Sequence, residues 1–419
     1  MKGGKKLLKN TIMLYLLTFS TYILNLIIVP YQTRTLGPEK FGLIGLATAI
    51  ITYVQLFIDF GFLLSATEEV ANNQDDKKKL SKIFTAVTLN KLLLSLVASA
   101  VLITVCMFVP RFRENFLFIL LYCVSTIFSS LIPDFLYRGI EKMESITIRT
   151  VLIRVFFTLM VFVFVKSPND YLLIPVLQII GNSIALLCTY VHLYFSLKIR
   201  FVFCKAKEVF SSMKTSVPFF ASRIAGTAYS VANTIILDLI SGGAMTAFYT
   251  SADKLVSTAK SGLSPISDSM YPYMVKNKDF KMVKRVLLLL EPIIIVGCTI
   301  LFIWAVPICT WFFGEEYTHT GYALRALLPV VVIILPSYIF GFPVLGAMGL
   351  NKYANYSVIF ASIIHIINLI LLYSLGIMSI VTLGIATSVA EFLVLIFRVA
   401  VVIKHRSKLR EGQNEKLID

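Results

Sequence analysis

Charge is scarce in this sequence. Only 15% of its 419 residues are Asp, Glu, Lys or Arg, whereas 57% are hydrophobic and the mean hydropathy is +0.82. Soluble domains carry about 25% charged residues, so this chain has too little polar surface to cover a water-soluble globule. The composition therefore predicts an integral membrane protein.

Motifs for catalysis and for metal binding are also missing. The six cysteines form no Cys-x-x-Cys pair, and the four histidines have no metal-ligand spacing. The sequence contains no Walker A, Gly-x-Ser-x-Gly or His-Glu-x-x-His pattern. These absences exclude a pump with its own nucleotide-binding domain on this chain. We expect a protein that is not an enzyme, with no metal site and no resident cofactor.

Long apolar runs, in contrast, follow one another along the whole chain, and each can cross a bilayer as a helix of about 20 residues. Twelve such runs lie near 12–31, 41–65, 84–109, 116–137, 146–165, 171–197, 216–240, 245–272, 286–306, 323–346, 354–375 and 379–403. They lack the period-two alternation of a barrel strand, and a helix satisfies its own backbone hydrogen bonds in lipid. We expect an all-α polytopic membrane protein with twelve transmembrane helices.

Lysine and arginine gather in alternate breaks between these runs. With the N-terminus inside, 27 of the 39 basic residues fall in cytoplasmic segments and 6 in outer segments. Because basic residues favour the cytoplasmic side of short loops, this split predicts that both termini are cytoplasmic. The net charge of +16 is dispersed over many loops, which indicates contact with anionic lipids rather than with nucleic acid.

The chain divides into two similar halves. We expect the following segments: an N-terminal six-helix bundle at 1–197, a basic cytoplasmic connector at 198–214, a C-terminal six-helix bundle at 215–403 and a cytoplasmic tail at 404–419. A weak internal repeat supports this division, because Leu36–Gly42 and Gly242–Tyr249 each open the second run of their half. Six helices per half make the repeats parallel, and with no large extramembrane loop the favoured class is a transporter.

Charged side chains inside the runs are the first candidates for a site, since each costs at least about 2.5–3.5 kcal/mol at a helix centre. On the run 245–272, Asp253, Ser257 and Lys260 lie on one helical face, with Lys254 next to Asp253. Such a stripe cannot face lipid, so it lines a cavity or packs against polar neighbours. Arg223 lies about nine residues into its own run after Lys214.

Other charged residues have simpler interpretations. Lys91, Arg154 and Arg398 lie within a few turns of the predicted cytoplasmic face, and we expect their long side chains to reach the interface. Asp134 and Arg138 are four residues apart near a helix end, which favours a local ion pair.

Three polar residues inside runs leave their role open. Asp59 either holds an ion or stabilises helix packing, and Glu391 is either a proton or ion site or part of a structural pair. For His365, a buried and hydrogen-bonded histidine is favoured over a cavity residue.

Four stretches resemble a known family. They are Arg34–Gly42, Asp59–Phe62, Ser216–Phe219 and Phe248–Leu255. These stretches, with the number and layout of the helices, resemble the Wzx-type polysaccharide flippases of the multidrug/oligosaccharidyl-lipid/polysaccharide (MOP) exporter superfamily. The resemblance covers nearly the whole chain, and the Arg-x-Leu-Gly-Pro-Glu-x-Phe-Gly stretch is its most specific part.

The resemblance implies a fold and a function. Two six-helix bundles surround a central cavity and give alternating access. The substrate is an undecaprenyl-pyrophosphate-linked oligosaccharide repeat unit, flipped from the inner to the outer leaflet of the bacterial cytoplasmic membrane for capsule or O-antigen synthesis. Implied partners are this glycolipid, anionic lipids, and the polysaccharide polymerase and glycosyltransferases. Whether H⁺ or Na⁺ serves as a coupling ion is left open.

The substrate implies roles for the polar residues of the runs. Cationic side chains suit the pyrophosphate: Arg223, Lys254 and Lys260. Hydroxyl, amide and aromatic side chains suit the sugars: Asn233, Tyr249, Ser251 and Ser257. Carboxylates suit a coupled ion or proton: Asp59, Asp253 and Glu391.

Other functions fit the sequence less well. A multidrug exporter of the same superfamily commonly needs an acidic cavity for organic cations, and a lipid II flippase would use the same phosphate chemistry. A membrane enzyme such as a glycosyl polymerase would need a large catalytic outer loop, and the sequence has none. A channel would need a pore or filter signature, which is also missing.

Overall fold

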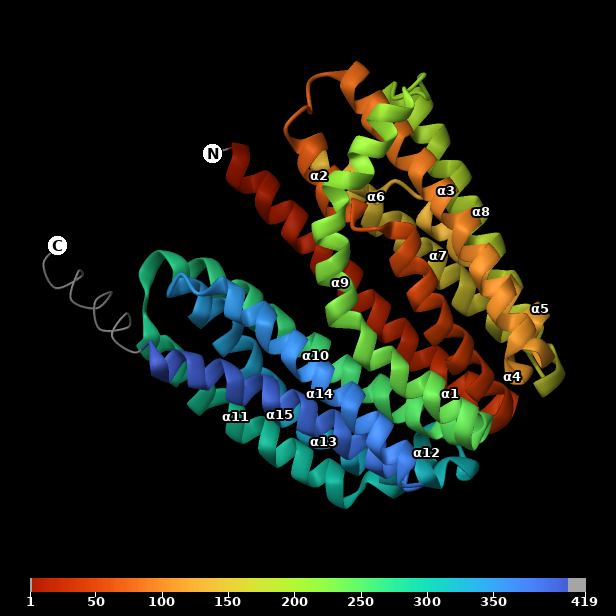
Figure 1. Ribbon diagram of the computed structural model, residues 1–419, viewed down its shortest axis with the longest axis vertical. Coiled ribbons are helices and arrows are strands. Elements are labelled where there is room, and N and C mark those ends of the chain that lie inside the picture. Colours follow the sequence, from red (N-terminus) through yellow and green to blue (C-terminus); the bar gives the residue numbers. More distant parts are fainter. Residues whose placement is uncertain (1, 406–419) are drawn as a thin grey trace, which may run out of the picture. The chain divides into compact units, whose positions relative to one another are not determined.

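The computed structural model describes residues 2–405, without the side chains of residues 2–12, 14, 222, 225–226, 228–230, 272 and 276–277. Within this part the chain is helical, with short turns and no strand (Figure 1). The all-α fold class predicted from the apolar runs is therefore confirmed. Residues 406–419, most of the predicted cytoplasmic tail, lie outside the described residues.

The helices have the following bounds: α1 Lys2–Asp59, α2 Phe62–Ala71, α3 Lys77–Phe108, α4 Pro110–Glu114, α5 Phe116–Ser130, α6 Asp134–Gly139, α7 Met143–Phe164, η1 Pro168–Leu172, α8 Leu173–His192, η2 Leu193–Leu197, α9 Ala206–Ser241, α10 Gly243–Asn277, α11 Phe280–Ile303, α12 Ala305–Phe313, η3 Glu315–Tyr317, α13 Thr318–Ile339, η4 Phe340–Leu345, α14 Asn351–Ser374 and α15 Ile380–Lys404. Each of the twelve predicted apolar runs falls on one or more of these helices.

Nine segments of the described part are long and apolar enough to span a membrane. The first, Tyr15–Ala71, has 57 residues and is interrupted at Gly37, whose backbone is not helical, so it contains two of the predicted runs. The nine do not include α9 and α10, which have 36 and 35 residues. The chain is thus a multi-pass membrane protein, and the number twelve stays a prediction.

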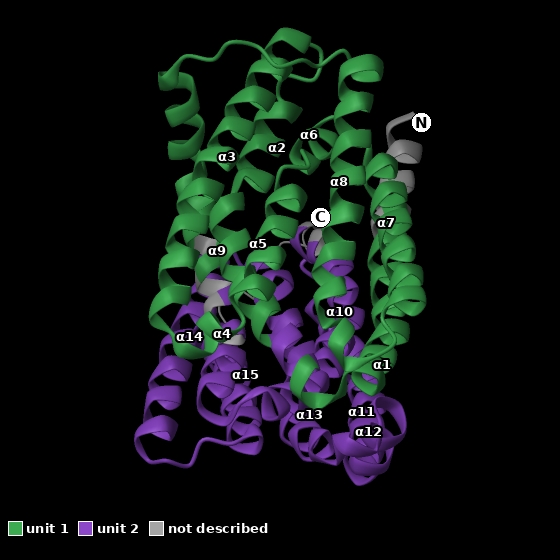
Figure 2. Cartoon of the chain, turned by 90° about the vertical axis from the view of Figure 1, so that its right-hand side faces the viewer, with its two compact units in different colours: residues 1–40, 46–224 green, residues 41–45, 225–419 purple. Residues whose placement is uncertain are grey.

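The chain folds into two compact units (Figure 2). The first unit comprises residues 1–40 and 46–224, and the second comprises residues 41–45 and 225–419. The boundary lies within α9, which already begins at Ala206, so the later part of the predicted connector 198–214 is helical. The predicted segment boundaries themselves stay a prediction.

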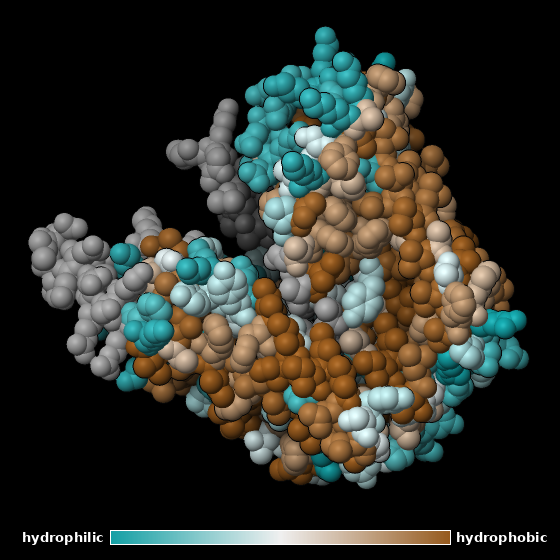
Figure 3. Space-filling view, in the orientation of Figure 1, coloured by the Kyte–Doolittle hydropathy of each residue, from teal (hydrophilic) through white to brown (hydrophobic). Residues whose placement is uncertain are grey.

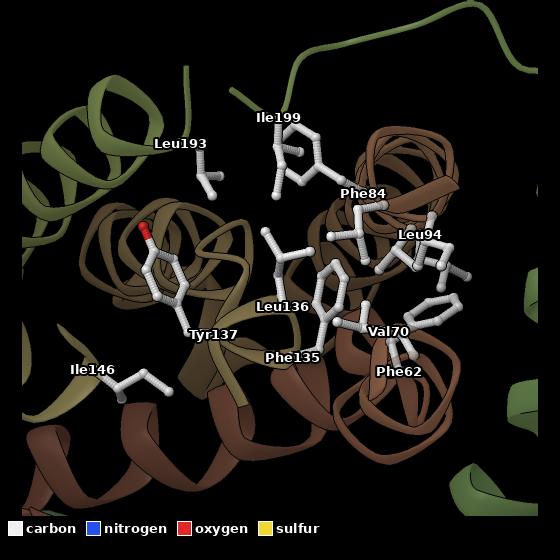
Figure 4. Close-up of a cluster of buried hydrophobic side chains, with 14 residues drawn as sticks. Phe62, Val70, Phe84, Leu94, Phe135, Leu136, Tyr137, Ile146, Leu193 and Ile199 are labelled. Atoms are coloured by element: carbon white, nitrogen blue, oxygen red, sulfur yellow. The ribbon is translucent and has the colours of Figure 1, made fainter. Parts of the chain in front are cut away.

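The core of the first unit lies where α2, α3 and α6 meet. Figure 4 shows the apolar side chains of this cluster pointing toward one another, among them Phe62 on α2, Phe84 on α3 and Leu136 on α6. These side chains are at most 1% exposed. In contrast, the outer flank of this unit in Figure 3 is apolar, as expected where a helix faces lipid, and hydrophilic residues gather at its ends.

Two predicted runs of the first unit are broken helices. The run 41–65 is interrupted at Phe60 and Gly61, which both have positive φ (39° and 79°). Glycine is needed here because a Cβ on Gly61 would lie 2.8 Å from the Phe219 side chain and from the backbone nitrogen of Phe220. The run 116–137 ends as a helix at Ser130, and α6 begins only after Pro133, which cannot donate a backbone hydrogen bond.

The second unit is organised around α13, which packs against α10, α11, α12 and α15, while α14 packs against α15. Its core cluster includes Met274, Leu335, Ile339 and Leu345, none of which is exposed. The apolar run of α13 is also broken, because it passes into the π-helix η4, where Gly341 has a non-helical ψ of −120°.

The internal repeat has a counterpart in the backbone. Gly37 has φ 72° and ψ 170°, and Gly242, which precedes α10, has φ 82° and ψ 179°. Each glycine directly precedes the helical segment that opens the second run of its half. Only glycine adopts this region of φ/ψ space readily, so the same turn chemistry occurs at both places that the sequence repeat marks.

Within the second unit, residues 41–45 approach α10 so closely that glycine is required at position 42. A Cβ on Gly42 would clash with the carbonyl oxygen of Gly243. We expect Gly42→Ala to lower the free energy of unfolding by about 1–3 kcal/mol, the cost of overpacking. Thermal unfolding of the purified protein in detergent measures this loss. The matched control is Gly262→Ala, because a Cβ at Gly262 meets nothing within 4 Å; equal melting temperatures for both variants would contradict the prediction.

Candidate functional site

The second unit contains an ion pair between two of its long helices. Lys260 on α10 donates to Glu391 on α15 with an Nζ to Oε1 distance of 2.6 Å. The side chain of Glu391 is only 6% exposed, whereas that of Lys260 is 26% exposed. The carboxylate is therefore held inside the unit, and the ammonium keeps a face that a ligand can reach.

The remaining members of the predicted polar stripe, Asp253 and Ser257, and their neighbour Lys254 also lie on α10. Lys254 places its Nζ 4.5 Å from the centre of the Phe41 ring, a cation–π contact within the second unit. Asp253 accepts a hydrogen bond from Ser257, one helical turn further on. Asp253 and Lys254 are half-buried and Ser257 is exposed. The charged and hydroxyl groups of the stripe therefore interact with one another, and Ser257 is also exposed.

Two of the four residues predicted to contact sugar, Asn233 and Tyr249, belong to a buried hydrogen-bond cluster. Asn233 donates through Nδ2 to the hydroxyl oxygens of Tyr249 and Thr387, each at 2.9 Å, and its Oδ1 lies 2.8 Å from Nε2 of His365. Asn233 and Tyr249 are 1% and 2% exposed, and Ser251 is fully buried. In this conformation, of the four predicted residues, only Ser257 is exposed. The interpretation of His365 as a buried, hydrogen-bonded histidine is confirmed.

In the first unit, Asp59 forms an ion pair that joins two broken helices. The Nζ of Lys91, on α3, lies 2.9 Å from Oδ1 of Asp59, the last residue of α1, and donates at 2.6 Å to the backbone carbonyl of Ser130, the last residue of α5. Helix C-termini have unsatisfied carbonyls and attract cations. The expectation that Lys91 extends to the membrane interface is therefore wrong: its side chain is 8% exposed and stabilises the two breaks.

Two other predictions about charged residues are also wrong. Arg398 does not extend to the interface but is 7% exposed, and its guanidinium donates to Ser337 and Ser357. Asp134 pairs with Arg149 on α7 rather than with Arg138 on its own helix. Arg398 forms hydrogen bonds with two other helices instead of reaching lipid headgroups. Asp134 pairs with an arginine on another helix instead of with one on its own helix, because that arginine offers a charge-assisted hydrogen bond.

Arg223 lies on α9 and is half-buried. It belongs to the first unit, whereas Lys254 and Lys260 belong to the second. The joint pyrophosphate site of these three residues therefore stays a prediction. Among the residues that the structure describes, no three His, Cys, Asp or Glu side chains come together as metal ligands.

A polar pocket that the sequence reasoning missed lies in the first unit. It has a volume of about 600 Å³ and is formed by α2, α3, the start of α9 and the residues after α2. Its lining residues are Ser65, Glu68, Glu69, Asn72, Asn73, Lys79, Lys82, Ile83, Ala86, Lys207, Glu208, Ser211, Ser212 and Thr215. We call it the α2–α9 pocket. The polar runs Glu68–Asn73 and Ser211–Thr215 could have signalled it, but nothing in sequence spacing brings them together.

The wall of the α2–α9 pocket is fixed by specific contacts. Glu208 accepts from the Lys82 ammonium at 3.0 Å and from the Lys205 backbone N–H at 2.9 Å. The hydrogen bond from Lys205 and the bond from Lys82 hold the pKa of the exposed Glu208 carboxyl below its usual range. Asn90 also donates to the Val209 carbonyl at 2.8 Å. The start of α9 is therefore held on α3 by charge and by hydrogen bonds.

The fold defines the class of protein. Over 98% of this chain and 91% of the other, it is similar to the solved structure of the lipid II flippase MurJ in an inward closed conformation, with a TM-score of 0.68 and 16% identity. Over 95% and 96% of the two chains, it is similar to an inward-facing multidrug resistance MATE family transporter of the MOP superfamily, with a TM-score of 0.67 and 12% identity. This chain therefore has the fold of these membrane transporters.

The family follows from the sequence comparison. The family described as polysaccharide biosynthesis protein matches residues 7–278, and this chain belongs to it. A protein of Escherichia coli K12 named "Putative O-antigen transporter" is 27% identical over 350 residues, 82% of this chain and 84% of its own. A protein of Shigella dysenteriae with the same name is 28% identical over 366 residues, 86% and 91% of the two chains. The predicted resemblance to this family is confirmed.

Proposed function

We propose that this protein flips undecaprenyl-pyrophosphate-linked oligosaccharide repeat units from the inner to the outer leaflet of the bacterial cytoplasmic membrane by alternating access, in the synthesis of capsule or O-antigen. The family, the names of its two relatives as O-antigen transporters and a fold shared with a lipid flippase support this proposal. The polymerase and the glycosyltransferases of the same polysaccharide are the proposed partners.

The observation that carries the proposal is the pair of half-buried lysines on α10. Lys254 and Lys260 lie within a predicted membrane span, and charges at that depth are costly unless they serve a polar ligand or partner. A pyrophosphate cannot cross hydrocarbon unaided. Ammonium groups bind phosphate oxygens through short, charge-assisted hydrogen bonds, while the prenyl chain remains in the lipid. Arg223 is the third proposed phosphate ligand.

The ion pair of Lys260 suggests how transport is coupled. Oε1 of Glu391 lies 2.6 Å from Nζ of Lys260, so Glu391 and an incoming phosphate compete for the same ammonium group. A coupling ion, H⁺ or Na⁺, that binds at Glu391 would weaken its attraction for Lys260 and let the ammonium bind the phosphate, and loss of the ion would reverse this exchange. Glu391 is therefore the proposed coupling group of this site. Asp253 is a second candidate on the same face of α10, and Asp59 is a third in the first unit.

The proposal predicts that Lys254→Ala lowers the rate of flipping about tenfold, the effect of losing one charge-assisted hydrogen bond of about 1.5 kcal/mol. Proteoliposomes containing the protein and a fluorescent undecaprenyl-pyrophosphate glycan measure the rate, with and without a proton or sodium gradient. Lys281→Ala, at an exposed position of α11, is the matched control and should flip at the wild-type rate.

The same experiment separates the alternatives. Unchanged flipping by Lys254→Ala would remove Lys254 from the proposed phosphate site. No flipping of any such glycolipid by the wild-type protein, together with gradient-driven export of small organic cations, would favour a multidrug exporter. Flipping of lipid II at an equal rate would favour a lipid II flippase.

A further inference from the structure

The α2–α9 pocket differs in charge from the rest of this basic chain. Its lining contains three lysines and three glutamates, so that its charges balance in a protein with a net charge of +16. One of each, Lys82 and Glu208, are already paired across the wall. A phosphate or another compact anion would therefore meet as much repulsion as attraction there, and the pocket is not suited to the charged part of the proposed substrate.

The uncharged lining residues define what the pocket can bind. Six of them carry hydroxyl or amide groups: Ser65, Asn72, Asn73, Ser211, Ser212 and Thr215. Hydroxyls donate and accept, amides do both through separate atoms, and carboxylates accept two or more bonds. The complementary ligand presents many hydroxyl groups that donate and accept at close spacing and carries no net charge. A saccharide has this chemistry, and a volume of about 600 Å³ lies within the range of small-molecule sites.

The location of the pocket fits a ligand that arrives from the cytoplasm. Two lining segments, the residues after α2 and the start of α9, lie in the stretches for which the basic residues predict the cytoplasmic side. The hydrophilic residues at the ends of this unit in Figure 3 agree with an aqueous surface there. The glycan of a lipid-linked repeat unit is assembled on that side before it is flipped.

We infer that the α2–α9 pocket is a saccharide site, which binds the glycan of the substrate and contributes to the selection of the repeat unit. The inference rests on the proposed function and deepens it, because it separates glycan recognition in the first unit from phosphate recognition by Lys254 and Lys260 in the second. It adds a second set of sugar-contacting residues, several of them exposed, to Asn233, Tyr249, Ser251 and Ser257, whose role as sugar ligands stays a proposal. A site that hydrogen-bonds a ligand hydroxyl discriminates strongly against an analogue without it.

The test uses the glycan alone. The oligosaccharide is released by mild acid from the host's own lipid-linked repeat unit, so that the probe carries neither lipid nor pyrophosphate, and its binding to the full-length protein in detergent is titrated by saturation-transfer NMR. We expect the double variant Asn72→Ala/Ser212→Ala to weaken binding at least about tenfold, the loss of one or two hydrogen bonds. Lys254→Ala should leave this binding within about twofold of wild type.

A second variant tests whether loss of binding reflects the pocket itself and not a change in folding. Ser211 lines the pocket and is exposed, so Ser211→Trp should occupy part of the pocket without disturbing a core, and it should abolish glycan binding. The control is Ser269→Trp, at an exposed serine of α10 in the second unit, which should bind as wild type does. Glycan binding that survives both pocket variants would overturn the inference, as would displacement of the bound glycan by inorganic pyrophosphate.

The outcome is separable from that of the proposed function. A protein that flips the intact glycolipid but shows no pocket-dependent binding of the free glycan would overturn the saccharide site and leave the flippase standing. A protein that binds the glycan in this pocket but flips no glycolipid would retain the site and refute the flippase.

Discussion

Replacing Lys260 with methionine is expected to lower the rate of flipping by about 10- to 100-fold and to destabilise the protein. The transport loss reflects one charge-assisted hydrogen bond to phosphate, worth about 1.5–3 kcal/mol. The stability loss arises because Glu391, 6% exposed, would be left without the ammonium that lies 2.6 Å from it. Removing one partner of a buried pair costs about 3–5 kcal/mol, and we expect the lower end because Lys260 is partly exposed. Equilibrium unfolding in mixed micelles and the proteoliposome assay measure the two effects.

The double variant Lys260→Met/Glu391→Gln separates these effects. It removes both charges and leaves two neutral side chains of similar volume, so stability should return to within about 1 kcal/mol of wild type. Flipping should remain as low as in Lys260→Met if Lys260 binds phosphate. Recovery of both stability and flipping would show that the pair serves packing alone, and the proposed exchange of partners at Lys260 would then be abandoned.

The single variant Glu391→Gln completes this set. With Glu391 neutral, Lys260 no longer faces a carboxylate at position 391, so the proposed exchange predicts that flipping no longer responds to an imposed pH gradient. A gradient response equal to that of wild type would assign the coupling to another carboxylate, with Asp253 and Asp59 as the remaining candidates.

Sequence reasoning was most successful where hydrophobicity and backbone chemistry act locally. The apolar runs located the helices, because lipid requires each spanning segment to satisfy its own backbone. The short repeat around Gly37 and Gly242 marked two places where a glycine adopts the same positive φ with an extended ψ. The family could be recognised from the stretches near these turns, and the match of residues 7–278 agrees with it.

Pairings between distant helices could not be read from spacing. Lys91 is 32 residues from Asp59 and 39 from Ser130, and the breaks at Gly61 and Pro133 that bring them together depend on tertiary packing. The predicted run 84–109 placed Lys91 about two turns from its start, whereas α3 begins at Lys77 and Lys91 lies near its middle. Sequence spacing therefore favoured a side chain that reaches the interface, whereas the actual partners are the Asp59 carboxylate and the unsatisfied carbonyl of Ser130, each at the end of another helix.

A cation stabilises a comparable break in the second unit. Arg398 on α15 donates through Nη1 to the carbonyl of Ser337 at 2.6 Å, where α13 gives way to η4, and through Nε to Oγ of Ser357 at 2.9 Å. The fit is close, since a Cβ on Gly341 would lie 2.9 Å from Nη1. Lys91 and Arg398 thus both donate to a backbone carbonyl at or near the end of a helix, one in each unit. Discontinuous helices of this kind are common in transporters, and they require such partners because hydrocarbon supplies none.

Arg398→Leu is accordingly expected to lower the free energy of unfolding by about 3 kcal/mol, because several buried acceptors would lose their donor at a cost of about 1–3 kcal/mol each. Arg398→Lys should restore little of this loss, since a single ammonium cannot reproduce the fork that reaches α13 and α14 together. Equilibrium unfolding in mixed micelles measures both variants. Arg285→Leu, at an exposed position of α11, is the matched control and should change stability by no more than about 0.5 kcal/mol. If Arg398→Lys were as stable as wild type, a single positive charge would be enough to stabilise the junction of α13 and η4. The several hydrogen bonds of the guanidinium would then not explain why an arginine occupies this position.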